Sequence, residues 1–231
     1  MIPLVIALLL FQPPPVDSAE TLTRQGRQAM ARNDFDAART AFTQAVLKAP
    51  ASPQARFLLG FFHYVDNDFV QAETTLRKAR ELAPQDPRTA LFLALTLDGL
   101  ARPAEAAAAF EETLQLEAKA KRPNPETHIA YARMLFAEGR LPDAQHQVSR
   151  ALTLNPRSRE AHYEQARLRF EAGNFPAAIA EATLALPLPS EGTTDRQLHF
   201  LLSRAFGRLG NTAKADEHRR AFEAIPAGVV R

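Results

Sequence analysis

The amino-acid sequence predicts an all-α protein built as a stack of helical hairpins, and three observations support this prediction. The stretch at residues 33–50, NDFDAARTAFTQAVLKAP, recurs 34 residues later at 67–84 as NDFVQAETTLRKARELAP. Related stretches follow at 139–156 and, in weaker form, from residue 173. Most copies share a turn-forming residue, apolar and small residues at fixed spacing, and a closing proline. A repeat of this length is typical of stacked helical units.

Six units result when the closing proline is placed at position 32 of each unit. They start near residues 19, 53, 87, 125, 159 and 196, with four extra residues within 117–123 and three within 187–195. Each unit contains two stretches with apolar residues at i, i+3, i+4 and i+7, the spacing that places them on one face of a helix. In the first unit these are Leu22, Gly26 and Ala29, then Phe35, Ala38, Phe42 and Ala45.

Turn and capping residues indicate where the helices begin and end. Residues that tolerate a positive φ follow the first helix of five units, namely Asn33, Asn67, Gly139, Gly173 and Gly210. Prolines at the start of a second helix cost no hydrogen bond, as expected for Pro103, Pro142 and Pro176. Small residues such as Gly26, opposite Ala38, and Gly60, opposite Ala72, predict close approach of paired helices.

This pattern resembles the tetratricopeptide repeat family. The matching positions are a small residue at 8, a glycine or polar residue near 15, alanines at 20 and 27, and proline at 32, over roughly residues 19–226. The resemblance implies a right-handed α-solenoid of about six helix–turn–helix repeats over residues 19–231. Tryptophan at position 4 is absent, the third unit has Ala118 for proline, and the fifth has Gln165 and Arg169 at usually apolar positions.

The amino terminus carries a short apolar run, MIPLVIALLLF. A bilayer span needs about 20 apolar residues, so we expect no stable membrane span. The run has the length of a secretory signal core, and small residues follow it. We therefore interpret residues 1–18 as a signal peptide or N-terminal hydrophobic segment. We expect an exported protein, periplasmic or secreted, or a membrane-anchored one if the segment is not cleaved.

Composition excludes several classes of function. The 28 basic and 26 acidic residues give a formal net charge of +2, too small to attract nucleic acid by bulk charge. The sequence contains no cysteine, which excludes disulfides, a thiolate nucleophile and a cysteine metal site. No phosphate-binding loop, nucleophile elbow or zinc-protease motif occurs. We therefore predict no enzymatic activity and no cofactor.

The six histidines also form no metal-binding motif. Three of them, His128, His162 and His199, occupy position 4 of consecutive units. Neighbouring packed helices lie about 8–10 Å apart, too far for shared ligation of one ion by adjacent units. In the family this position packs between helices, so the resemblance implies a structural role for these three residues.

Functional residues are expected on the first helix of each unit, because in the family positions 2, 5, 9, 12 and 13 of this helix line a concave groove. Units two and three place apolar residues there, and units four to six repeat arginine at position 9 beside aromatic residues. Aromatic and arginine side chains are enriched among interface anchors. The predicted groove residues are Phe57, Phe61, Tyr64, Leu91, Leu95, Arg133, Phe136, Tyr163, Arg167, Phe170, Phe200 and Arg204.

Two interpretations of these aromatic residues remain open: they bind a ligand, or they pack within the stack. The sequence favours a non-enzymatic protein–protein interaction module that binds a peptide or helix of a partner in its groove, in the cell envelope. The first alternative is a scaffold or assembly factor of an envelope complex that self-associates through its open ends. The second, a hydrolase or metal enzyme, has no motif to support it. Members of the family that bind chaperone tails hold the terminal carboxylate with Lys and Asn at fixed places in their first units. Here the first two units have Thr23, Arg27, Phe57 and Phe61, so this clamp is absent.

Overall fold

The computed structural model describes residues 18–189 and 192–226, and this part of the chain is entirely helical apart from turns and loops. The predicted all-α fold is therefore confirmed. The twelve helices of these residues are α1 (Ala19–Ala31), α2 (Phe35–Lys48), α3 (Pro53–Val65), α4 (Phe69–Leu82), α5 (Pro87–Gly99), α6 (Pro103–Lys119), α7 (Pro125–Ala137), α8 (Leu141–Leu154), α9 (Arg159–Glu171), α10 (Phe175–Ala185), α11 (Asp195–Arg208) and α12 (Thr212–Ala224).

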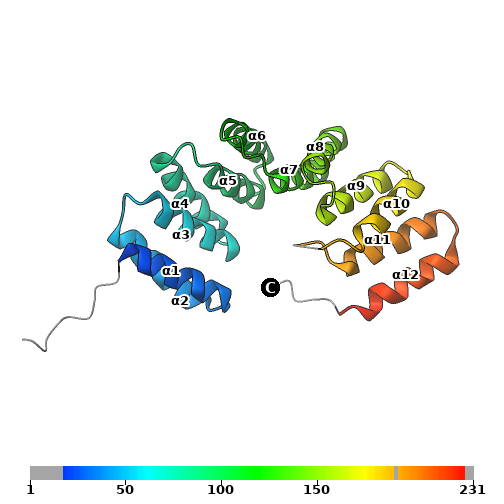
Figure 1. Ribbon diagram of the computed structural model, residues 1–231, viewed down its shortest axis with the longest axis horizontal. Helices are drawn as coiled ribbons and strands as arrows, with labels where there is room; N and C mark the ends of the chain where they lie inside the picture. Colours follow the sequence, from blue (N-terminus) through cyan, green and yellow to red (C-terminus); the bar gives the residue numbers. More distant parts are fainter. Residues whose placement is uncertain (1–17, 190–191, 227–231) are drawn as a thin grey trace, which may run out of the picture. The chain divides into compact units, whose positions relative to one another are not determined.

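The chain divides into two compact units, Met1–Arg102 and Pro103–Arg231. In the first unit, α1 pairs with α2 and α3 with α4, and α5 packs on α4 and α3 (Figure 1). In the second unit the pairs are α7 with α8, α9 with α10, and α11 with α12, while α6 packs on α7. The boundary falls between the two helices of the third predicted hairpin, within the single solenoid that the repeat pattern predicts.

Local chemistry sets the helix ends. Side chains of Ser, Thr, Asp or Asn accept a hydrogen bond from the first turn at the start of most helices, for example Ser52 before α3 and Asp68 before α4. The turns between paired helices have a positive φ at all five predicted residues, Asn33, Asn67, Gly139, Gly173 and Gly210. Ala101 takes the same conformation after α5, although alanine adopts it at a cost.

The inserted residues have structural roles. Those after the third unit lengthen α6 to 17 residues, and its buried Glu117 accepts a hydrogen bond from the Thr127 hydroxyl of α7 at 2.6 Å. Those before the sixth unit form a loop that the buried Glu160 of α9 anchors. Its carboxylate accepts hydrogen bonds from the backbone N–H groups of Gly192 and Thr193. Hydrogen bonds to a buried carboxylate therefore connect both insertions to a neighbouring repeat.

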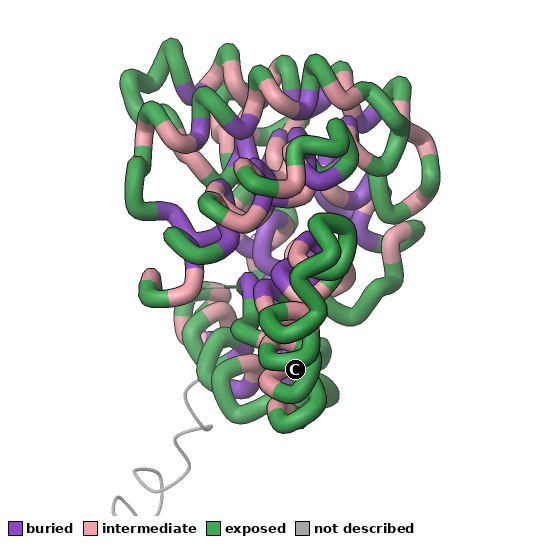
Figure 2. The backbone as a smooth tube through the Cα atoms, turned by 90° about the vertical axis from the view of Figure 1, so that its right-hand side faces the viewer, coloured by how far each residue is buried: buried purple, intermediate pink, exposed green. Residues whose placement is uncertain are grey.

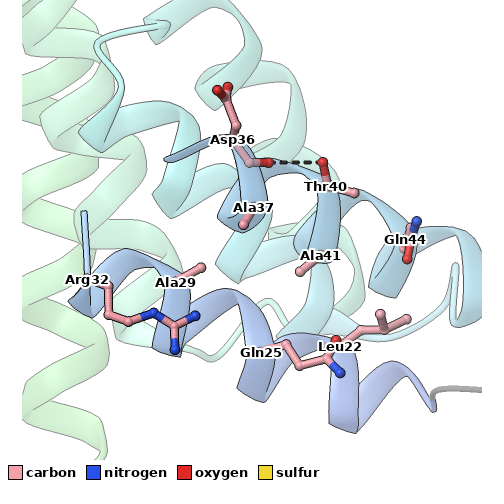
Figure 3. A pocket seen from close by; sticks show the side chains of 9 residues that line it. All are labelled: Leu22, Gln25, Ala29, Arg32, Asp36, Ala37, Thr40, Ala41 and Gln44. Atoms are coloured by element: carbon pink, nitrogen blue, oxygen red, sulfur yellow. Dashed lines mark hydrogen bonds between the residues drawn. The ribbon is translucent and has the colours of Figure 1, made fainter. Parts of the chain in front are cut away.

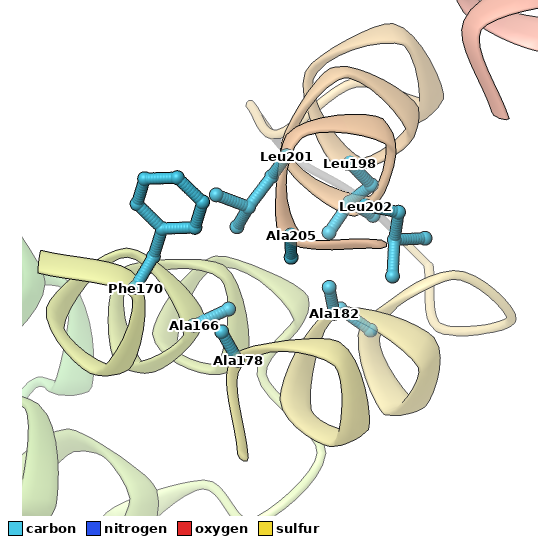
Figure 4. Packing of buried hydrophobic residues seen from close by; sticks show 9 residues of the cluster. Ala166, Phe170, Ala178, Ala182, Leu198, Leu201, Leu202 and Ala205 are labelled. Carbon is cyan, nitrogen blue, oxygen red and sulfur yellow. The ribbon is translucent and has the colours of Figure 1, made fainter. Parts of the chain in front are cut away.

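Within each unit the buried residues lie mostly where helices face one another, and the turns between paired helices are mostly exposed (Figure 2). The core is rich in alanine, so few large side chains fill the space between paired helices. In the second unit Ala166 of α9 and Ala178 and Ala182 of α10 meet Leu198 and Leu202 of α11 (Figure 4). This packing continues the core from the fifth hairpin into the sixth. The helix α12 has no buried residue.

Two glycines allow the close approach of paired helices that the sequence predicts, although their nearest neighbours differ from the expected ones. A Cβ on Gly26 would lie 2.6 Å from the Phe42 ring, and a Cβ on Gly60 would lie 2.7 Å from the Leu76 side chain. The sequence placed these glycines opposite Ala38 and Ala72. The contact lies one turn further along the second helix, where a large side chain occupies the space that glycine leaves.

We expect Gly60→Ala to destabilise the protein by about 1–3 kcal/mol, because the new methyl group overpacks a fully buried leucine. The matched control is Gly207→Ala in α11, where a Cβ would meet no atom within 4 Å. This second change should stabilise by up to about 1 kcal/mol through helix propensity alone. Urea unfolding measures both. Equal effects of the two changes would contradict the packing argument.

No described helix is both long and apolar enough to cross a membrane. The predicted signal peptide or hydrophobic segment at residues 1–18 lies outside the described residues, except for Ser18. Ser18 is the residue that caps α1, because its hydroxyl accepts a hydrogen bond from the Thr21 N–H.

Candidate protein-binding surface

The predicted groove residues lie on the first helices of the hairpins. We call the side-chain surface that bears them the A-helix surface, formed by α3 and α5 in the first unit and separately by α7, α9 and α11 in the second. Five of the residues belong to the first unit and seven to the second, so each unit is described separately.

An aromatic cluster forms the A-helix surface of the first unit. Phe57 and Phe61 of α3 stack with ring centroids 6.3 Å apart, and Tyr64 follows one turn later. Phe92 of α5 contacts all three rings, at 5.8, 4.8 and 5.4 Å respectively. Partial burial raises the pKa of the Tyr64 hydroxyl, and the Asp98 carboxylate raises it further.

The exposure of these residues differs. Phe57 is only 8% exposed, and the Arg88 guanidinium lies 5.2 Å from its ring centroid. Phe61, Tyr64, Leu91 and Leu95 remain partly exposed. Phe57 therefore packs beneath the exposed side of the cluster. Phe61, Tyr64, Leu91 and Leu95 offer apolar surface to a ligand.

An ion-paired triad occupies the same surface in the second unit. Glu164 of α9 is 3% exposed, and its two carboxylate oxygens accept hydrogen bonds of 2.6 Å each. One comes from Nε of Arg133 on α7 and the other from a terminal nitrogen of Arg167 on α9. A buried carboxylate needs such partners, because an uncompensated charge is costly to bury. Arg133 and Arg167, two of the three predicted groove arginines, therefore both form ion pairs with the buried Glu164.

Arg167 also stacks on aromatic rings of the surface. Its guanidinium carbon lies 4.1 Å from the Phe136 ring centroid and 5.9 Å from that of Tyr163. Partial burial raises the pKa of the Tyr163 hydroxyl, with the nearby Arg167 guanidinium acting in the opposite direction. The side chain of Arg167 is 31% exposed, so part of it remains accessible beside two rings.

The third arginine has a different environment. The Arg204 guanidinium of α11 lies 4.7 Å from the ring centroid of Phe170 and 5.6 Å from that of Phe200. Among the described residues no carboxylate pairs with it. Phe200 is 47% exposed, whereas Phe170 is 7% exposed and belongs to the core cluster beside Leu201 (Figure 4). We call Arg204, Phe170 and Phe200 the Arg204 cluster.

Sequence reasoning missed position 6 of the first helix. In the third unit this position holds Phe92, which closes the aromatic cluster, and in the fifth it holds Glu164, which joins the two arginines. In both cases the position-6 side chain reaches the position-9 side chain of the preceding unit, Phe61 or Arg133, 31 residues earlier. The pairing of unlike charges at this spacing was visible in the sequence.

A separate hollow lies between α1 and α2 of the first unit (Figure 3). Leu22, Ala29, Ala37 and Ala41 form its apolar part, and polar side chains surround them, namely Gln25, Arg32, Asp36, Thr40 and Gln44. None of the predicted groove residues lines this hollow. It exists because small alanines face each other where larger residues, His63 and Thr75, occupy the equivalent positions of the second hairpin.

The described residues contain no group of three or more histidine or acidic side chains arranged to hold a metal ion. The A-helix surface presents apolar and aromatic side chains in the first unit and guanidinium groups beside aromatic rings in the second.

Paired helices in a repeating register, with varied side chains on the first helix of each pair, define a helical-repeat protein. The family model described as the tetratricopeptide repeat matches residues 23–87 and 129–192. These segments make up more than half of the chain, so the protein belongs to the tetratricopeptide repeat family. No curated protein matches the sequence.

Solved structures share this fold. PilW, described as a widely conserved type IV pilus biogenesis factor, is 20% identical, with a TM-score of 0.79 over 91% of this chain and 95% of that chain. PilF of Pseudomonas aeruginosa is 16% identical, with a TM-score of 0.75 over 91% and 93%. A thermophilic tetratricopeptide repeat protein of Thermus thermophilus is 18% identical, with a TM-score of 0.65 over 83% and 99%. These similarities show the fold and confirm its all-α, helical-repeat class.

Proposed function

We propose that the protein is a non-enzymatic interaction module that binds a peptide or helix of a partner protein on its A-helix surface. The observation that carries the proposal is the Arg204 cluster. An exposed guanidinium lies against two rings, one of them half exposed, without a carboxylate from the described residues. A charge held this way is oriented for an acidic group of a ligand, to which arginine can donate two parallel hydrogen bonds.

The remaining surface supplies apolar contacts. In the first unit Phe61, Tyr64, Leu91 and Leu95 would cover apolar side chains of the partner, with Phe57 and Phe92 holding the rings in place. Rigid aromatic side chains lose little conformational entropy when a ligand covers them, which favours their use as anchors. We therefore propose that a ligand of the first unit carries apolar residues and that a ligand of the second unit carries an acidic group.

We also propose that the protein is exported and acts in the cell envelope, as an interaction or assembly factor. The short apolar run at the amino terminus supports export. The similarity in fold to PilW, a type IV pilus biogenesis factor, supports an assembly role in the envelope. Fractionation of cells that express the full chain, with an antibody to its carboxyl terminus, tests the location. Recovery only in the cytoplasm would contradict it.

Photo-crosslinking tests the binding surface. A crosslinking phenylalanine analogue at Phe200 should trap a discrete partner, whereas the same analogue at Leu184, 56% exposed on α10, should not. We expect Arg204→Glu to reduce the crosslinked yield at least about tenfold, since it replaces attraction of an acidic group by repulsion. The matched control is Arg150→Glu on the second helix α8, which should crosslink normally. Equal losses from both changes, or equal trapping at both sites, would contradict the proposal.

The arginines differ in what their substitution would report. The sequence alone suggests that changing Arg133, Arg167 and Arg204 to glutamate removes binding without a change in melting. The contacts of Glu164 indicate otherwise, because two of these changes would place new carboxylates beside a buried one. Arg204 is therefore the residue whose substitution separates binding from stability.

The alternative of self-association through the open ends receives less support. Between the first two hairpins Phe35 and Phe42 of α2 contact Phe62 of α3. The equivalent residues of α12 are Thr212 and Arg219, both polar and exposed. A terminal repeat with a polar outer face is typical of a capped helical stack. We therefore propose partner binding on the A-helix surface and not end-to-end stacking.

A further inference from the structure

The position-4 histidines form a repeated hydrogen bond that neither the repeat pattern nor the binding surface explains. In three consecutive hairpins Nδ1 of this histidine meets a polar side chain 19 residues later, on the second helix of the same hairpin. His128 meets Oε1 of Gln147 at 2.7 Å, and His162 meets Oε2 of Glu181 at 2.7 Å. His199 meets Nδ1 of His218 at 3.0 Å. The same pair of repeat positions therefore joins a histidine to an amide, a carboxylate and a second imidazole in the three hairpins.

The three pairs respond differently to protons. The amide oxygen of Gln147 accepts a hydrogen bond from His128 in either charge state of the imidazole. Both ring nitrogens of His162 face oxygen acceptors, Glu181 and the Pro156 carbonyl, and only an imidazolium can donate to both. Between His199 and His218 one Nδ1 must donate and the other must accept. That bond is lost when both rings are protonated, and two positive charges then face each other.

We propose that the His199–His218 pair is an acid-sensitive contact that holds α12 on α11, and that α12 loosens when both rings become protonated. The inference does not depend on the proposed binding function. The helix is suited to local opening, because it has no buried residue and, within the described part of the chain, packs on α11 alone (Figure 1). Its other contacts include Phe222 against Phe200 and the Ser203 hydroxyl donating to the Ala215 carbonyl.

The surroundings of the pair favour the uncharged state of His218. Burial lowers the pKa of the His218 imidazole below 6.5, His199 of α11 lowers it further, and Lys214 of α12 acts in the same direction. Glu217 of α12 acts in the opposite direction. Among the described residues no hydrogen bond or ion pair joins either ring to α9 or α10. The Phe206 ring lies parallel to His218 and also contacts the Lys214 ammonium, so it already interacts with one cation.

The sign of the pH dependence follows from this lowered pKa. Between the folded pKa and 6.5 the folded state holds fewer protons on His218 than the unfolded state does. The contribution of the pair to stability is therefore fully present above pH 6.5. It is lost as the pH falls through the folded pKa.

Hydrogen–deuterium exchange of the full chain, measured with a chelator present between about pH 7.5 and 5, tests the proposal. After correction for intrinsic exchange rates, protection of α12 should fall with acidification, because the unfolded state takes up protons at His218 that the folded state resists. Protection of α8, whose hairpin holds the His128–Gln147 pair, should stay constant and is the internal control. Constant protection of α12, or equal loss in α8, would overturn the proposal.

Two substitutions of His218 introduce the residue types that face the position-4 histidine in the fourth and fifth hairpins. His218→Gln copies the Gln147 arrangement and should remove the acid-induced loss of protection. His218→Glu copies the Glu181 arrangement and should reverse its sign, so that α12 becomes better protected as the pH falls. A loss in His218→Gln equal to that of the unchanged protein would assign the effect to other groups. If a variant fails to fold, the comparison of α12 with α8 in the unchanged protein still decides.

Discussion

Phe62→Ala is expected to destabilise the first unit by about 3–5 kcal/mol, the range for removing a fully buried phenylalanine. Phe62 is 0% exposed, and its ring lies 6.4 Å from that of Phe35 and 6.2 Å from that of Phe42. Both contacts come from α2, so the substitution opens a cavity between the first and second hairpins. Urea unfolding followed by circular dichroism measures the loss.

Phe61→Ala is the matched control on the same helix. Phe61 lies one residue earlier and is partly exposed on the A-helix surface, where it contacts Phe57 and Phe92. Its substitution should cost clearly less stability and should weaken partner binding instead. A loss for Phe62→Ala no larger than that for Phe61→Ala would contradict the assignment of one ring to the core and the other to the surface.

Removing both guanidinium groups of the triad is expected to give the second large effect. In the double variant Arg133→Met and Arg167→Met, the Glu164 carboxylate stays 3% exposed but loses both ion-pair partners. An unpaired buried charge costs about 3–5 kcal/mol. We expect about 3 kcal/mol, the lower end of that range, because the guanidinium groups themselves are partly solvated. Urea unfolding at neutral pH measures the difference.

A third substitution in the same background identifies the cause. Adding Glu164→Leu to the double variant should recover most of the lost stability, since a buried apolar group replaces a buried charge. Recovery would show that the two arginines serve mainly to neutralise Glu164. A triple variant as unstable as the double variant would instead indicate that the arginine stems matter through packing.

Sequence reasoning predicted the helices closely because several local signals agree at each boundary. The unit starts at residues 19, 53, 87, 125 and 159 coincide with the first residues of α1, α3, α5, α7 and α9. At these ends a capping side chain, a proline or a turn residue coincides with the repeat period. The sixth unit begins at Asp195, one residue before the predicted start, after a loop whose length interrupts the period.

The surface was less predictable, because its chemistry depends on contacts between neighbouring units. The repeat pattern placed arginine at the same position of three units and gave no means to tell them apart. The structure distinguishes them by one residue, since Glu164 pairs with Arg133 and Arg167 while Arg204 lies on two rings. Burial separates the aromatic residues in the same way: Phe170 belongs to the core, and Phe200 is half exposed.

The shared carboxylate of Glu164 also affects how related sequences should be compared. Arginine at the positions of Arg133 and Arg167 would be maintained wherever an acid occupies the position of Glu164, whatever the protein binds. Joint change at these three positions would then record selection for folding. Arg204 pairs with no carboxylate of the described residues, so folding does not require arginine at this position in the same way. Variation there would instead reflect changes of binding partner.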